Sequence, residues 1–344
     1  MIFYILAAVV WLTLCVWKSL HSITRLHLPH YVFALPLIFL ATLRGEVGTD
    51  TATYRDNVRL IFWWGDKGSS NEPGYDMMLR ALHLVTGDPR VVVALLSLLA
   101  AVLFFAMLHH WEEGESALSL LLVPVCYFDF TMNGLRMGIA FPLAALAVLH
   151  LEKKRLLLFY ALAIAAVSVQ MTAAFLLLLL LLARFGLRLS WRGVGIGMLV
   201  AVSVLAPGYY FLGDRIALKF LSYAAMPAPS SLSGTGPLLL SLGACALALA
   251  ISPRTRSVAL HFVLIQLACF RLSSYTYAGL RFQEMALFAQ ILALSYGAAR
   301  PLPRRQLAAL VLLSLLAWGW TSRNFLQSAG EPSAFVPYRF VWEE

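Results

Sequence analysis

Charged side chains are scarce in this chain. Asp, Glu, Lys and Arg make up 12% of its 344 residues, whereas 61% are hydrophobic. A soluble domain usually carries about a quarter charged residues, so the composition argues against an ordinary soluble enzyme. We expect an all-α fold in which residues 1–344 form one polytopic, integral membrane helical bundle.

Cysteine is also scarce, and its placement excludes two classes of site. The four cysteines have no metal-ligand spacing and lie inside apolar runs, at Cys15, Cys126, Cys245 and Cys269. We therefore predict neither a disulfide framework nor a cysteine metal site. A strongly basic segment before the first apolar run is missing as well, since Lys18 follows that run. This order predicts an uncleaved span rather than a secretory signal.

Apolar runs recur along the chain and predict about twelve membrane spans. They cover roughly residues 2–17, 31–43, 91–108, 117–127, 138–149, 156–169, 171–183, 194–212, 237–251, 258–270, 282–298 and 307–320. Several are shorter than the roughly 20 residues of a straight crossing. Short spans are tolerated where neighbouring helices bury them or the bilayer thins locally.

The distribution of Lys and Arg predicts the orientation. Basic loops at residues 18–25, 153–155, 184–192, 254–256 and 300–305 should be cytoplasmic, with the acidic turn 109–115 as an exception on that side. The net charge of +9 then reflects topology rather than nucleic-acid binding. The other side takes an extended, partly helical periplasmic loop at 44–90, a second loop at 213–236 and a C-terminal periplasmic tail at 321–344. The loop at 213–236 is a plain connector or a gate, and we favour the connector.

The most polar stretch of the chain is 43–76, where charges of both signs alternate with aromatic residues. This mixture suits a sugar-phosphate ligand. Trp63 and Trp64 form either an interfacial aromatic belt, which is the simpler interpretation, or a platform for sugar rings. The carboxylates of the stretch lack the spacing of a calcium loop, so we predict no metal.

Several arginines lie at the ends of apolar segments on this same side. An arginine there can simply reach the lipid headgroups, but several on one face favour a phosphate site, because guanidinium binds phosphate oxygens in a bidentate manner. These arginines are Arg44, Arg136, Arg271 and Arg281, and Glu284 follows Arg281 by one helical turn. We expect the arginines to hold a lipid diphosphate.

Two further polar positions stand out. Asp129 and Asn133 precede Arg136, and Asp129 either caps a helix or pairs with that arginine. Gln170 lies between two apolar runs. A helix–helix hydrogen bond is the more common use of such a glutamine, and a ligand contact is the alternative.

Four segments together resemble one family. They are RGEVGTDTATYRDN (44–57), NEPGYDMMLRAL (71–82), the segment NGLRMGIAFPLAALAVLHLEKKRLLLFYALAIAAVSVQMTAAF (133–175) and FVPYRF (335–340). Their order and spacing are similar to those of the EpsG/Wzy-like family of polysaccharide repeat-unit polymerases.

The resemblance implies an enzyme of the bacterial inner membrane whose active face is periplasmic. It would join oligosaccharide repeat units carried on undecaprenyl diphosphate, without a cofactor, in contact with membrane lipids and with a chain-length-regulating co-polymerase as partner. The family usually has His where this chain has Gln170, and glutamine cannot act as a general base. Either Gln170 only orients a substrate hydroxyl, or a carboxylate elsewhere acts as the base.

The hypothesis from the sequence assigns two groups of residues. The catalytic group is Asp50, Glu72, Arg136 and Gln170, with no metal. The substrate-binding group is Arg44, Tyr54, Trp63, Trp64, Asp129, Arg281 and Glu284. Whether the transfer inverts or retains stereochemistry stays open. The alternatives are an O-antigen ligase, a glycosyltransferase using a lipid-phosphate sugar, and a flippase for lipid-linked oligosaccharide; a transporter would need polar residues at the membrane midplane.

Overall fold

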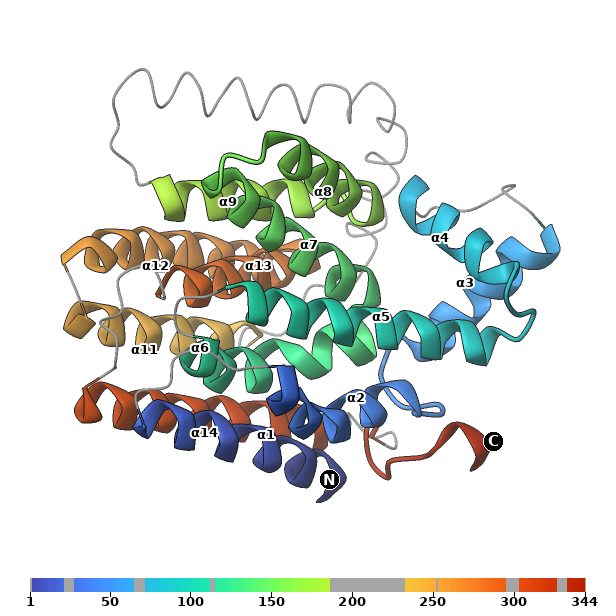
Figure 1. Ribbon diagram of the computed structural model, residues 1–344, viewed down its shortest axis with the longest axis horizontal. Coiled ribbons are helices and arrows are strands. Elements are labelled where there is room, and N and C mark those ends of the chain that lie inside the picture. The colour runs from blue at the N-terminus through green and yellow to red at the C-terminus, as the bar shows by residue number, and fades with distance from the viewer. Residues whose placement is uncertain are drawn as a thin grey trace. The chain divides into compact units, whose positions relative to one another are not determined.

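The computed structural model describes residues 2–21, 28–64, 72–111, 115–185, 233–251, 253–294, 303–326 and 333–343. Over these residues the chain is helical and contains no strand, which confirms the all-α class (Figure 1). The predicted span at 194–212 and most of the predicted loop at 213–236 lie outside the described residues.

Three helices are long and apolar enough to cross a membrane: α1 (Ile2–Leu20), α5 (Pro89–His110) and α7 (Leu135–Glu152). Shorter apolar helical segments cover Pro29–Thr42, Leu118–Tyr127, Leu156–Val169, Ala173–Arg184, Thr235–Leu249 and Val258–Ser273. These helices make the chain a membrane protein. The count of about twelve spans stays a prediction, as do the sides of the membrane on which the loops lie.

The chain divides into two compact units, one formed by residues 1–173 with 300–344 and the other by 174–299. In the first unit α7 packs against α5 and α8 (Leu156–Val169). Its buried residues surround the whole helix, which is the pattern of a helix enclosed by others rather than one with a single buried face. Helices α1, α2 (Leu35–Thr42), α6 (Glu115–Leu122) and α14 (Arg304–Leu326) also belong to this unit.

A π-helical stretch leads into α7. Helix α6 continues as η2 (Val123–Tyr127) and, after one residue, as η3 (Asp129–Asn133), which ends at Gly134. A Cβ added at Gly138 would lie 2.0 Å from the Phe130 carbonyl oxygen, so α7 packs directly on η3. Single-turn π-helices occur often at functional sites, and this one places Arg136 at the start of the enclosed helix.

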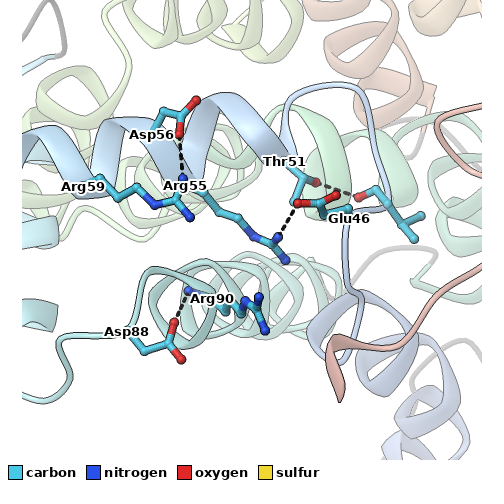
Figure 2. Close-up of polar contacts among 8 residues, drawn as sticks. Glu46, Thr51, Arg55, Asp56, Arg59, Asp88 and Arg90 are labelled. Atoms are coloured by element: carbon cyan, nitrogen blue, oxygen red, sulfur yellow. Dashed lines mark hydrogen bonds and ion pairs between the residues drawn. The ribbon is translucent and has the colours of Figure 1, made fainter. Parts of the chain in front are cut away.

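The segment 44–90 contains two helices, α3 (Thr51–Trp64) and α4 (Pro73–His83). Helix α3 packs on α5, and α4 packs on α8 (Figure 1). Figure 2 shows the polar contacts of this region. Arg55 pairs with Glu46 at 3.0 Å, and Arg59 pairs with Asp56 at 3.1 Å along α3.

The C-terminal segment, residues 333–343, lies along the stretch between α2 and α3. The Gly48 N–H donates to the Ala334 carbonyl at 2.8 Å, and the Val341 N–H donates to the Leu43 carbonyl at 3.0 Å. Gly48 has φ +103°, a conformation that glycine adopts at no steric cost. The C-terminal segment thus lies against the loop that carries the 44–57 motif.

The second unit contains α9 (Ala173–Phe185), α11 (Thr235–Ile251), α12 (Pro253–Ser273) and α13 (Tyr277–Leu294). Buried amides join its helices. The Ser241 hydroxyl donates to Gln290 Oε1 at 2.6 Å, and Gln266 Nε2 donates to the Gln283 carbonyl at 2.8 Å. Such interhelical bonds supply specificity where apolar contacts with lipid and with protein are equivalent.

Candidate functional site

An ion pair between Glu72 and Arg136 forms the centre of the candidate site. Arg136 Nη1 donates to Glu72 Oε2 at 2.9 Å, although the two residues are 64 positions apart. The second carboxylate oxygen accepts from the Met171 N–H at 3.3 Å. Glu72 is only 4% exposed. Because both its oxygens are engaged and it is removed from water, this carboxylate is suited to orienting Arg136.

Two tyrosines complete the surroundings of Arg136. Its guanidinium lies over the Tyr75 ring, 5.6 Å from the ring centroid, and Tyr54 forms a side-chain hydrogen bond with it. Burial raises the pKa of Tyr75 well above its usual value, so this phenol stays neutral. We refer to Arg136, Glu72, Tyr54 and Tyr75 as the Arg136 cluster. Its members come from α3, α4, α7 and the residue before α4.

A glycine lets α4 bring Glu72 to this position. A Cβ at Gly74 would lie 2.3 Å from Ser168 Oγ and 2.7 Å from the Ser168 carbonyl carbon. Only a residue without a side chain allows the start of α4 to lie against the end of α8 this closely. Met171 follows that end, so the same contact brings its N–H to the Glu72 carboxylate.

Gln170 breaks the helix between α8 and α9. Its backbone is extended, at φ −148° and ψ 110°, and it is buried. Its Nε2 donates locally to Thr172 Oγ1 at 3.1 Å. Oε1 has no hydrogen-bond partner among the residues that the structure describes. A buried carbonyl oxygen of this kind can accept a hydrogen bond from a ligand hydroxyl.

Arg44 lies deeper than the sequence suggests. It is 3% exposed, and Nη1 donates to the Thr131 carbonyl of η3. Within the described part of the chain, Nε and Nη2 have no partner. Burial lowers the pKa of Arg44 to about 10, and nearby tyrosines, Tyr54 first among them, act in the opposite direction. The buried position favours an indirect role, in which Arg44 holds η3 in place for the site.

A hydrogen-bond chain connects the 44–57 motif to the residues before Arg136. The Thr49 N–H donates to Asn133 Oδ1 at 3.0 Å, and Asn133 Nδ2 donates to Asp129 Oδ1 at 3.2 Å. The ion pair that the structure shows for Arg136 is with Glu72 rather than with Asp129. Asp129 and Asn133 therefore hold the loop against η3.

Asp50 directly precedes α3 and is half-buried. Its Oδ1 accepts from Thr49 Oγ1 at 3.1 Å, and no basic side chain in the described ranges pairs with it. Trp63 is exposed at the end of α3. The side chain of Trp64 lies outside the described residues.

Arg281 and Glu284 belong to the second unit. They form an ion pair of 3.1 Å along α13, and both side chains are partly exposed. Their place relative to the Arg136 cluster stays a prediction. Sequence reasoning did not select Tyr75 or the Met171 N–H. The signal for Tyr75 was its position in the 71–82 motif, whereas a main-chain donor at a helix break leaves no trace in the sequence.

The first unit thus defines a helical membrane protein with a preorganised arginine at the start of an enclosed helix. The sequence model of the EpsG family matches residues 28–340, and the chain belongs to this family. Membership associates it with polymerases of polysaccharide biosynthesis. No curated protein matches the chain, and no solved structure matches it.

Proposed function

We propose that this protein polymerises oligosaccharide repeat units carried on undecaprenyl diphosphate, at the periplasmic face of the bacterial inner membrane. The bond between the glycan's anomeric carbon and the diphosphate oxygen breaks, and an acceptor hydroxyl oxygen bonds to that carbon. The lipid diphosphate leaves, and the hydroxyl proton passes to a base. The observation that carries the proposal is the oriented Arg136 in a member of the EpsG family.

Arg136 stabilises the negative charge that grows on the departing diphosphate. Its side chain is 26% exposed, whereas Glu72 beneath it is nearly inaccessible, so a ligand reaches the guanidinium but not its counter-ion. Donors already in place for charge that develops in the transition state usually supply a large share of catalysis. Arg44 holds η3 through its bond to the Thr131 carbonyl and adds positive charge. A contribution of Arg281 and Glu284 to diphosphate binding stays a prediction from the sequence.

Asp50 is the stronger candidate for the base. Both oxygens of Glu72 are bound, by Arg136 and by the Met171 N–H, which stabilises its ionised form and weakens it as a proton acceptor. Asp50 has no such ion pair in the described part of the structure and neighbours Thr49, which is tied to Asn133. Gln170 Oε1 positions the acceptor hydroxyl.

The remaining residues bind the glycan and its carrier. Tyr54 presents its phenol beside Arg136, and Asp129 supports the loop that carries Asp50. Trp63 and Trp64 stack on sugar rings or anchor α3 in the interface. A co-polymerase partner would set the length of the product.

Radiolabelled lipid-linked repeat units, incubated with the purified protein in detergent, test the proposal. A ladder of products without a membrane gradient supports a polymerase, and Arg136→Ala should abolish it. Arg59→Ala, at an exposed ion pair of α3, is the matched control and should retain the ladder. Cells lacking the protein should keep single-repeat material and lose long polymer. Lipid-linked units trapped on the cytoplasmic face would instead show export and overturn the proposal.

A further inference from the structure

Helix α4 turns an apolar face outward. Met77 is 71% exposed, Leu84 just after the helix is 89% exposed and Val85 is 75% exposed. Met77 and Leu84 are seven residues apart, which places them on one side of a helix. Tyr75 and Leu79 on the opposite side are fully buried. Helix α4 therefore presents apolar side chains both to the protein interior and on its exposed side.

A short connection leads from this apolar face to α5, a helix long enough to span a membrane. Five residues separate α4 from α5, and Asp88 caps the start of α5 by accepting from the Arg90 N–H at 2.8 Å. Along α5, the exposed large side chains are Val91, Leu99 and Val102. Exposed apolar side chains thus lie on α4 and on α5, a helix long enough to cross a membrane. Exposed apolar surface of this kind marks a contact with a protein or a membrane.

Basic and aromatic side chains border the apolar face. Arg80 lies one turn from Met77 on the exposed side of α4, and Arg90 is exposed at the start of α5. Trp63 and Leu60 are exposed at the end of α3. Arginine beside lipid phosphates and tryptophan at headgroup level are the usual anchors of an interfacial helix.

We propose that α4 and the end of α3 lie in the lipid interface, with Met77, Leu84 and Val85 in contact with the acyl chains of the leaflet at that end of α5. The occupant of this face is the bilayer itself. A short connection to a helix of spanning length, exposed apolar side chains on both helices and flanking arginines all favour lipid over a protein partner.

The position of α4 has a consequence for the site. Glu72 directly precedes α4 and holds Arg136, so an interfacial α4 places the Arg136 cluster at the depth of lipid phosphates. A lipid diphosphate could then be bound while its hydrocarbon tail remains in the membrane. The contact of α4 with lipid does not depend on the reaction proposed above.

Nitroxide labels on single cysteines test this position, because oxygen concentrates in the bilayer whereas a nickel chelate stays in water. The native cysteines are buried. Labels go at Met77→Cys and Leu84→Cys, whose exposed positions leave packing intact. Asp56→Cys on the polar side of α3 is the aqueous standard, and Val102→Cys on α5 is the lipid standard. The protein is reconstituted in vesicles of phosphatidylethanolamine and phosphatidylglycerol.

We expect the ratio of oxygen to nickel accessibility at Met77 and Leu84 to exceed that at Asp56 several-fold and to approach that at Val102. Ratios equal to the Asp56 value would show that the face is in water and overturn the proposal. Low accessibility to both reagents would show that protein covers the face, which also overturns it. Neither result would bear on ladder formation, so failure here is distinct from failure of the proposed polymerase.

Discussion

Replacing Glu72 with Gln tests the role of the Arg136 cluster most directly. Glutamine keeps the size of the side chain and an oxygen that can accept from the Met171 N–H, but it leaves Arg136 without its counter-ion. Breaking a buried pair in this way costs several kcal/mol. Because the Arg136 side chain is 26% exposed, solvent screens part of that cost. We expect a loss of about 2 kcal/mol, or a fall in Tm of about 3 °C.

Polymer synthesis should fall further than stability. A guanidinium that loses its carboxylate no longer points in one direction, and a displacement of about 1 Å can cost about a hundredfold in rate. The assay is the initial rate of ladder formation by purified Glu72→Gln protein from radiolabelled lipid-linked repeat units. Thermal unfolding in the same detergent gives the stability.

A double-mutant cycle separates the pair from its members. Arg136→Gln alone and together with Glu72→Gln should show a coupling energy of about 1–2 kcal/mol, because the double variant has no unpaired charge. The matched cycle uses Asp56→Asn and Arg59→Gln, an exposed pair of nearly the same length, where coupling should stay below about 0.5 kcal/mol. Wild-type Tm and wild-type ladder yield from Glu72→Gln would refute the orienting role.

Three other substitutions, the first with a matched control, address the contacts around the site. Gly74→Ala places a methyl group 2.3 Å from Ser168 Oγ and should reduce the amount of polymer ladder on a glycan gel. Its control is Gly87→Ala, whose added methyl group meets nothing within 4 Å and should leave the ladder unchanged. Arg44→Met removes a charge whose folded pKa, about 10, lies below its usual value. The unfolded chain holds that proton more tightly, so the charge lowers stability at every pH below about 10. Melts from about pH 6 to about pH 9 should show a Tm no lower than wild type and a constant difference, and a lower Tm would contradict this reasoning. Tyr338→Phe removes a 2.7 Å bond to a main-chain carbonyl of α2 and should cost about 1 kcal/mol in thermal unfolding; an unchanged Tm would show that the C-terminal segment is held by its other contacts.

The class of protein and the type of its elements followed from the sequence alone. Low charge and repeated apolar runs specify helices in a membrane, because an unpaired backbone is costly in lipid wherever it occurs. The run at 156–169 coincides with α8. The 44–57, 71–82 and 133–175 segments directed attention to Asp50, Glu72 and Arg136. These signals are local: composition and periodicity indicate the helices, and the resemblance of the segments to a family indicates the residues.

Only the tertiary structure decided which polar groups meet. The sequence left open whether Asp129 pairs with Arg136. The close approach of α4 to α8 at Gly74 joins Glu72 to that arginine. Arg44 looked like a surface ligand by its place at the end of an apolar run, yet η3 and the C-terminal segment bury it. Partners separated by many residues depend on how helices pack, and helix packing depends on shape and volume, which hydrophobic pattern does not encode.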